Sequence, residues 1–176
     1  IIDCNVYSDR DNKTWLFLNK KKHESDSCSD LYIYLVDSLK FNKITPHKLN
    51  PVITDATRAR NAGPIFSYEE KIFRPSQINI NGQYGSGINF NEILNLSITN
   101  YKERIYKKYL PDLYLNYTGL HHIHFNKDFS VFDFTLTFTT AGFCFFAIST
   151  NRLLVSCCVA LLKAKESLLV QNIIQI

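Results

Sequence analysis

The chain has 176 residues, of which 14% are aromatic and 20% are charged, and its formal net charge is +4. This length can bury a full core, so we expect one domain or part of a larger one. The composition excludes a disordered protein, and the mild, dispersed positive charge argues against a nucleic-acid partner. Five cysteines without a CxxC spacing argue against a disulfide framework or a zinc site, and they leave the compartment open.

The first part of the chain alternates short apolar or aromatic runs with polar turns. Strands are predicted at 14–19, 31–37 and 65–74, and turn-forming clusters stand at 9–13 and 23–30. This succession predicts an antiparallel meander and not a βαβ unit. Because the sequence begins with Ile1 and contains no methionine, we also expect that it lacks its true N-terminus.

The middle of the chain predicts further short elements. Glycines at 82, 85 and 87 predict a loop, and the elements after it cover 88–96 and 101–109. Residues 91–96 are equally compatible with a helical turn. A hairpin is predicted from 120–126 and 129–134, which flank a polar turn at Lys127-Asp128.

The last part of the chain is apolar. Residues 134–151 carry no charge, and a second apolar run covers 153–162. A membrane span needs about 20 predominantly apolar residues, and threonines interrupt the first run. Buried strands followed by an amphipathic helix at 153–170 are therefore favoured over a span.

Two groups of polar residues could carry chemistry. Arg74 and Gln77 are predicted to end a strand, where they could face a cleft together with Arg60 and contact hydroxyls, carboxylates or phosphates. The alternative for Arg74 is a surface ion pair with Glu69 or Glu70.

The second group is the histidine cluster in GLHHIHF, residues 119–125. On a strand, His122 and His124 share one face, and His121 lies on the other. The pair at i, i+2 could bind a metal, but the sequence places no third ligand. We therefore expect no metal and no cofactor, with His122 and His124 facing solvent and His121 buried and hydrogen-bonded.

Several motifs in order carry a resemblance to a known family. They are IIDCNVYSDRDNKTWLFLN, SDLYIYLVDSL, ITPHKLNPVITDATRARNAGPIF, KIFRPSQ, YGSGINFNEILNLS, YKE and GLHHIHF followed by VFDF. Together they resemble the N-terminal domain of glucosamine inositolphosphorylceramide transferase and its bacterial relatives. That domain is a five-bladed β-propeller related to the arabinanase and fructosidase glycoside hydrolases. The resemblance runs from Asp3 to about Asp133, and it does not include residues 135–176.

The resemblance implies an all-β fold, a partial five-bladed propeller made of the later blades, with the N-terminal blade missing. Residues 1–134 would form the blades, and 135–176 would form an apolar tail, open to a helical structure. Asp3 resembles the aspartate that tunes the general acid in the hydrolases, although Cys4 replaces the usual proline. An aspartate that caps a turn is the alternative for Asp3.

A second position decides the expected chemistry. Ala62-Gly63-Pro64 stands where the hydrolases have Glu-Gly-Pro, and a methyl group cannot donate the proton that the glutamate supplies. The resemblance then leaves polar groups for substrate binding, namely Arg60, Arg74, Gln77, Tyr84 and His121.

We therefore expect a domain of a glycosyltransferase-associated protein that binds a carbohydrate or sugar-lipid without hydrolysing it. The alternative is an arabinanase-type glycoside hydrolase, in which Asp3 acts with a replaced general acid. Glu103 in Tyr-Lys-Glu is the best candidate for that acid, ahead of Glu69 and Glu70. A third possibility is an interaction propeller that binds no sugar.

Overall fold

The structure is a computed structural model in which thirteen β-strands make up the regular structure of the described residues. The described residues are 1–21, 23, 29–37, 39–81, 83–110, 117–125, 129–136, 142–149 and 153–154. This part of the chain contains no α-helix, and hence no helix that could cross a membrane. The prediction of an all-β fold is confirmed.

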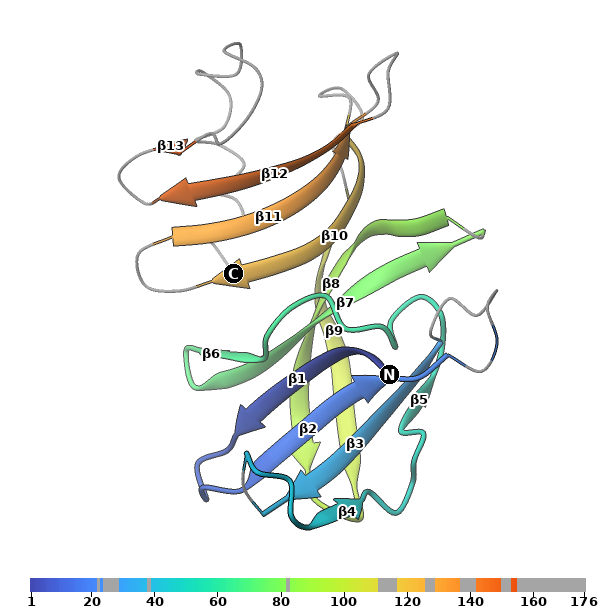
Figure 1. The fold of residues 1–176 in the computed structure, drawn as a ribbon, viewed down its shortest axis with the longest axis vertical. Helices are drawn as coiled ribbons and strands as arrows, with labels where there is room; N and C mark the ends of the chain where they lie inside the picture. Colours follow the sequence, from blue (N-terminus) through green and yellow to red (C-terminus); the bar gives the residue numbers. More distant parts are fainter. Residues whose placement is uncertain are drawn as a thin grey trace.

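The first sheet is an antiparallel meander in chain order (Figure 1). Its strands are β1 (Ile2–Ser8), β2 (Thr14–Asn19), β3 (Asp30–Val36) and β4 (Ile44–Pro46), and the short β5 (Ile53–Thr54) also pairs with β3. The strands predicted at 14–19 and 31–37 are confirmed as β2 and β3. β1 lies outside the predicted strands, because polar residues interrupt its apolar pattern.

The second sheet holds two further meanders. The first consists of β6 (Phe66–Tyr68), β7 (Lys71–Ile80), β8 (Gln83–Leu96) and β9 (Tyr101–Tyr109). The second consists of β10 (Tyr117–Phe125), β11 (Phe129–Leu136), β12 (Gly142–Ser149) and β13 (Leu153–Leu154). A parallel bridge between Leu120 and Ser86 joins β10 to β8, whereas all other pairs are antiparallel. Three four-stranded meanders thus follow one another along the chain.

Three predictions for the middle of the chain were wrong. Gly85 and Gly87 were predicted to lie in a loop, but both belong to β8. The strand predicted at 65–74 is broken by a tight turn at Glu69 and Glu70, whose φ angles are 45° and 63°. As a consequence, Arg74 lies inside β7 and not at a strand end. Residues 91–96 belong to β8 and form no helical turn.

The predictions for the last part of the chain have different outcomes. The predicted hairpin is confirmed as β10 and β11. Strands occur at 142–149 and 153–154, and the rest of the helix predicted at 153–170 lies outside the described residues.

The inner face of the first sheet packs on the second sheet. Trp15, Phe17, Leu31 and Ile33 are buried there, in one cluster with Ile93 of β8. Each such side chain contributes about 1.5–3 kcal/mol when it is fully buried. The ring of Phe17 also meets the edge of Tyr101 on β9, at a centroid distance of 6.0 Å. This core fixes β2 and β3 against β8 and β9.

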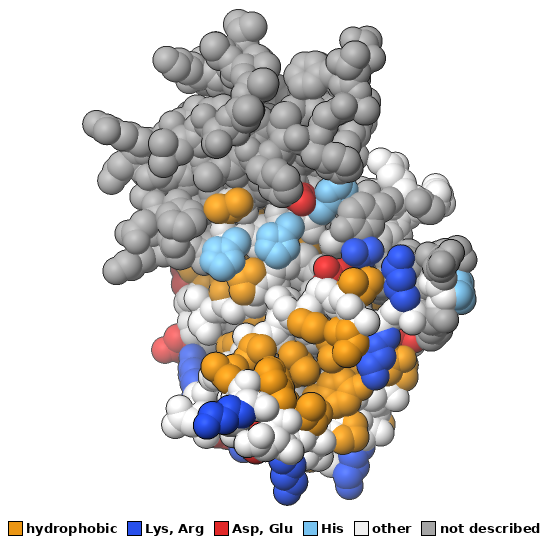
Figure 2. Space-filling model, viewed as in Figure 1, with side chains coloured by type: hydrophobic (Ala, Val, Ile, Leu, Met, Phe, Trp, Pro, Cys, Tyr) orange, Lys and Arg blue, Asp and Glu red, His pale blue; other side chains and the backbone are white. Residues whose placement is uncertain are grey.

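The outer face of the first sheet is also apolar. Val6, Leu16, Tyr34 and Pro46 stand opposite one another across β1 to β4, and so they form a continuous row. Lys20 donates a hydrogen bond to the Tyr34 hydroxyl at 2.7 Å. Figure 2 shows hydrophobic side chains gathered over this sheet, on the face opposite the core.

Candidate functional site

Three parts of the chain that are distant in sequence meet at Ala62 and Gly63. The backbone N–H of Ile123 in β10 donates to the Ala62 carbonyl at 2.8 Å, and the N–H of Ala62 donates to Pro75 in β7 at 3.0 Å. From β1, the side chain of Asn5 donates to the Gly63 carbonyl at 2.6 Å. A Cβ at Gly63 would lie 1.9 Å from the Ile123 carbonyl oxygen, so only glycine allows this approach. The segment before β6 therefore holds β1 and β10 beside each other.

Asp3 projects from a β-bulge next to this junction. The register of β1 against β2 shifts between Ile2 and Asn5, and Asp3 has a φ of 50°, in the left-handed region. Bulges of this kind redirect a side chain, and non-glycine residues in left-handed conformations are concentrated at functional sites. The local backbone of β1 thus turns the Asp3 carboxylate away from the regular alternation of the strand.

The redirected carboxylate forms an ion pair with Arg60. Arg60 Nε lies 2.7 Å from Asp3 Oδ2, and the side chains are 14% and 31% exposed, respectively. The amide of Asn61 fixes the backbone of the same residue by donating to the Asp3 carbonyl at 2.7 Å. Both side chains of the pair are therefore partly exposed.

The histidine cluster on β10 lies as predicted. His121 is buried, whereas His122 and His124 are exposed. His121 Nδ1 lies 3.2 Å from Asp133 Oδ1, and the backbone N–H of His121 donates to the same oxygen at 3.1 Å. A Cβ at Gly85 would lie 1.7 Å from His121 Cδ2, so the imidazole packs directly on the Gly85 backbone. Asp133 and Gly85 therefore hold His121 in one orientation.

His122, the next residue of β10, has a shifted pKa. Partial desolvation of its ring lowers the pKa of His122, although the residue is exposed; the charges of Asp133 and Asp3 oppose this shift, and His124 adds to it. Figure 2 shows histidine side chains gathered on one face, between the first sheet and the part of the second sheet that contains β10. The candidate site thus consists of the Asp3–Arg60 ion pair, the His121–Asp133 pair and the exposed imidazoles of His122 and His124.

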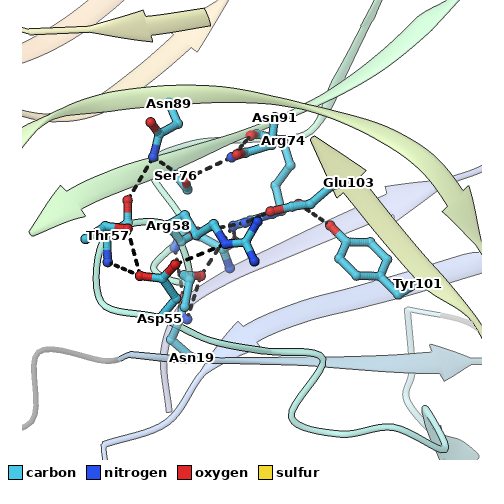
Figure 3. A network of polar contacts seen from close by, with 12 residues as sticks. Asn19, Asp55, Thr57, Arg58, Arg74, Ser76, Asn89, Asn91, Tyr101 and Glu103 are labelled. Atoms are coloured by element: carbon cyan, nitrogen blue, oxygen red, sulfur yellow. Dashed lines mark hydrogen bonds and ion pairs between the residues drawn. The ribbon is translucent and has the colours of Figure 1, made fainter. Parts of the chain in front are cut away.

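Arg74 has a different environment from Arg60. Its side chain is 0% exposed and pairs with the Glu103 side chain, which is 3% exposed. The guanidinium donates to both carboxylate oxygens of Glu103, from Nε at 2.9 Å and from Nη2 at 2.8 Å (Figure 3). This two-pronged geometry is the strongest form of an arginine–carboxylate pair.

The remaining donors of Arg74 hold the connection that precedes β6. They reach the carbonyls of Arg58 at 2.8 Å and Ala59 at 3.3 Å, and the Asn61 side chain at 3.1 Å. Burial acts to lower the pKa of Arg74, but the charge of Glu103 and the hydrogen bonds to its carboxylate outweigh burial and raise that pKa above its ordinary value. Arg74 therefore stays charged and fixes residues 58–61, which places Arg60 beside Asp3.

Tyr101 completes this interior group. Its hydroxyl donates to Glu103, and burial together with the charge of Glu103 raises the pKa of Tyr101 well above its usual value. Asn19 of β2 adds support, because its side chain donates to the Ala59 carbonyl at 3.1 Å and accepts from the Asn61 N–H at 2.9 Å. Neither Tyr101 nor Asn19 was identified from the sequence.

The predicted site residues therefore separate into two groups. The structure pairs Asp3 with Arg60 at the β1 bulge and His121 with Asp133, whereas the side chains of Arg74, Gln77 and Glu103 are interior. The side chain of Tyr84 lies outside the described part. Asp133, which contacts His121, and His122, which stands opposite Asp133 in the register of β10 and β11, were not among the predicted site residues. Among the described residues, no group of three or more His, Cys, Asp or Glu side chains could hold a metal ion.

Comparison with known proteins gives one match. Residues 1–111 match the sequence profile of the family described as glucosamine inositolphosphorylceramide transferase 1, N-terminal. No curated protein and no solved structure matches the chain. The matched region covers more than half of the sequence, and it includes β1 to β9 with Asp3 and Arg60. The chain therefore belongs to the family of the N-terminal domain of glucosamine inositolphosphorylceramide transferase 1.

Proposed function

We propose that this glycosyltransferase-associated domain binds a sugar or sugar conjugate at Asp3 and Arg60 and does not hydrolyse it. The observation that carries the proposal is the ion pair at the β1 bulge, which remains open to solvent. A guanidinium offers a planar fork of donors, and a carboxylate offers acceptors, so the pair matches adjacent sugar hydroxyls.

The strand order supports a partial propeller. Three four-stranded antiparallel meanders in succession are the expected form of propeller blades. The first strand of the first meander and the first strand of the third both contact the segment at Ala62 and Gly63. This convergence supports a common axis lined by β1, by the residues that precede β6, and by β10. Asp3, Arg60 and His121 would lie near that axis.

The pairing and burial of the carboxylates argue against hydrolysis. Glycosidases use two carboxyl groups across the scissile bond, and one of them must donate a proton. Asp3 is paired with Arg60, and Asp133 is paired with His121. Glu103 is buried against Arg74, where a substrate cannot reach it. Proton donation typically contributes about 10²- to 10⁴-fold to the rate, so a hydrolase would need an acid that this site does not offer.

The name of the family suggests which ligands to test. It contains glucosamine and inositolphosphorylceramide, which combine an amino sugar with a phosphorylated inositol. The Asp3 carboxylate suits an amine or hydroxyl, and the Arg60 guanidinium suits a hydroxyl or phosphate. Glucosamine, N-acetylglucosamine and myo-inositol 1-phosphate are therefore the first probes.

Calorimetric titration of the whole chain with these three probes tests the proposal. We expect binding of at least one probe, and a loss of about tenfold or more in Arg60→Gln and Asp3→Asn, because each removes a charge-assisted hydrogen bond. Arg104→Gln is the matched control, because Arg104 also pairs with a carboxylate, that of Glu92, at 2.7 Å. Equal affinity in Arg60→Gln and the wild type would count against this site.

A second assay separates binding from hydrolysis. The chain is incubated with nitrophenyl arabinofuranoside and with a fructoside, and release of the product is followed over time. We expect no release above the buffer rate. Release that Asp3→Asn abolishes without loss of folding would instead support the hydrolase alternative.

A further inference from the structure

The segment that follows β3 exposes an unusual number of large apolar side chains. In residues 39–49, Leu39 is 70% exposed, Phe41 39%, Ile44 48% and Leu49 59%. Single exposed apolar residues are normal on a protein surface, but a concentration of them marks an interaction site. We name residues 39–49 the basic-apolar segment.

The charges of this segment have one sign. Lys40, Lys43 and Lys48 are all exposed, and they alternate along the chain with the apolar residues. No acidic residue occurs between Asp37 and Asp55. The segment therefore presents positive charge together with apolar surface.

The fold holds the basic-apolar segment in place. Ile44 pairs with Val36 of β3, and the backbone N–H of Asp37 donates to the Lys43 carbonyl at 3.1 Å. Phe41 has a φ of 53°, a conformation that bulky side chains rarely adopt. The apolar residues are therefore presented by a closed hairpin loop and the short strand β4.

The segment continues the apolar outer face of the first sheet. Pro46 of β4 stands opposite Tyr34 of β3, and Leu16 and Val6 extend the same row across β2 and β1. In Figure 2, hydrophobic side chains cover this sheet, and Lys or Arg side chains appear at the lower rim of the molecule. An extended apolar face with a basic rim results.

We propose that the basic-apolar segment docks this domain on the surface of an anionic lipid bilayer. Leu39 and Phe41 would enter the boundary between headgroups and acyl chains, and the lysines would pair with lipid phosphates. Tyr34 lies on the adjoining face, and tyrosine is favoured at the membrane–water interface. A second copy of the chain is a poorer occupant, because it would bring the same three lysines of both copies together.

Co-sedimentation of the 176-residue chain with vesicles tests this proposal. One set of vesicles contains phosphatidylcholine alone, and the other also contains phosphatidylserine. We expect binding to the second set only, weakened by added salt because screening reduces the attraction. Each lysine near an anionic surface is worth about fivefold in binding, so the triple variant Lys40→Gln, Lys43→Gln, Lys48→Gln should bind about 100-fold more weakly.

The control variant changes the same number of charges elsewhere. Lys102, Lys107 and Lys108 lie on β9, and their replacement by glutamine should reduce vesicle binding far less. A second test variant, Leu39→Ser with Phe41→Ser, keeps all the lysines but removes the apolar side chains, and it should lose vesicle binding as the triple lysine variant does. Thermal melting of each variant shows that it remains folded.

A fluorescence measurement reports insertion directly. Trp15 is the only tryptophan and is buried, so its emission provides a constant background. A tryptophan introduced by Phe41→Trp should shift its emission to shorter wavelength when phosphatidylserine vesicles are added. Equal binding to both vesicle types, equal loss in the β9 control, or no shift would overturn the proposal. The proposal would also be overturned, in favour of self-association, if the wild type does not bind vesicles but forms a dimer. In that case the double variant Leu39→Ser, Phe41→Ser should be monomeric.

Discussion

Replacement of Arg74 by methionine tests the structural foundation of the site. The change leaves the Glu103 carboxylate buried without its cation, since that side chain is only 3% exposed. Removal of one partner from a buried ion pair typically costs about 3–5 kcal/mol of unfolding free energy. The change also removes the donors for the Arg58 and Ala59 carbonyls. We therefore expect a loss at the upper end of this range or beyond it.

A double variant separates the charge from the lost hydrogen bonds. In Arg74→Met with Glu103→Leu, no uncompensated charge remains, but the Arg58 and Ala59 carbonyls still lack a donor. Each unsatisfied buried group costs about 1–3 kcal/mol. The double variant should therefore be less destabilised than Arg74→Met alone, although it should not reach the stability of the wild type.

Urea unfolding followed by tryptophan fluorescence measures both effects. Trp15 is the only tryptophan, and it lies in the core between the two sheets. Small domains have unfolding free energies of about 5–15 kcal/mol, so Arg74→Lys serves as a milder variant if Arg74→Met does not fold. A loss of less than about 1 kcal/mol in Arg74→Met, or simple additivity in the double variant, would refute the structural role assigned to this pair.

Three further predictions concern the site and its surroundings. Gly85→Ala places a methyl group 1.7 Å from His121 Cδ2, at a φ of 63°, so it should destabilise the fold by more than about 1 kcal/mol in urea unfolding. Although burial acts to raise the pKa of Asp9, hydrogen bonds to its carboxylate lower that pKa below 3.8. The wild type should therefore melt at a higher temperature than Asp9→Asn at any pH above 3.8. This difference in melting temperature should disappear as the pH falls below 3.8 and through the lower pKa of the folded state. The pKa of His122, measured by NMR titration, should lie below 6.5, and Asp133→Asn should lower it further because it removes an opposing charge.

Strands with a clear local pattern of apolar residues between polar turns were predictable from the sequence. β2 and β3 are dominated by aromatic and branched residues between polar turns, and both occur where predicted. The hairpin of β10 and β11 was equally clear, because a polar turn separates two alternating runs. Its register also pairs His122 with Asp133, so the turn position alone could have pointed to Asp133. That signal was present in the sequence and was not used.

Other features depend on contacts that a local pattern does not contain. Glu69 and Glu70 adopt positive φ angles in the turn between β6 and β7, where glycine, asparagine or aspartate would be the usual signal. The bulge at Asp3 gives no compositional sign. Arg74 is buried because its partner is Glu103, which is 29 residues further along the chain. A charged residue is normally predicted to be exposed when its ion-pair partner is distant in sequence.

The location of sugar-induced changes in an amide NMR spectrum tests the central claim most directly. The chain is titrated with glucosamine or myo-inositol 1-phosphate, and the shifts of assigned amides are followed. We expect the largest shifts at Asp3, Arg60 and His122, with little change in β9. Shifts confined to residues 39–49, or none at saturating ligand, would contradict a sugar site at the Asp3–Arg60 pair.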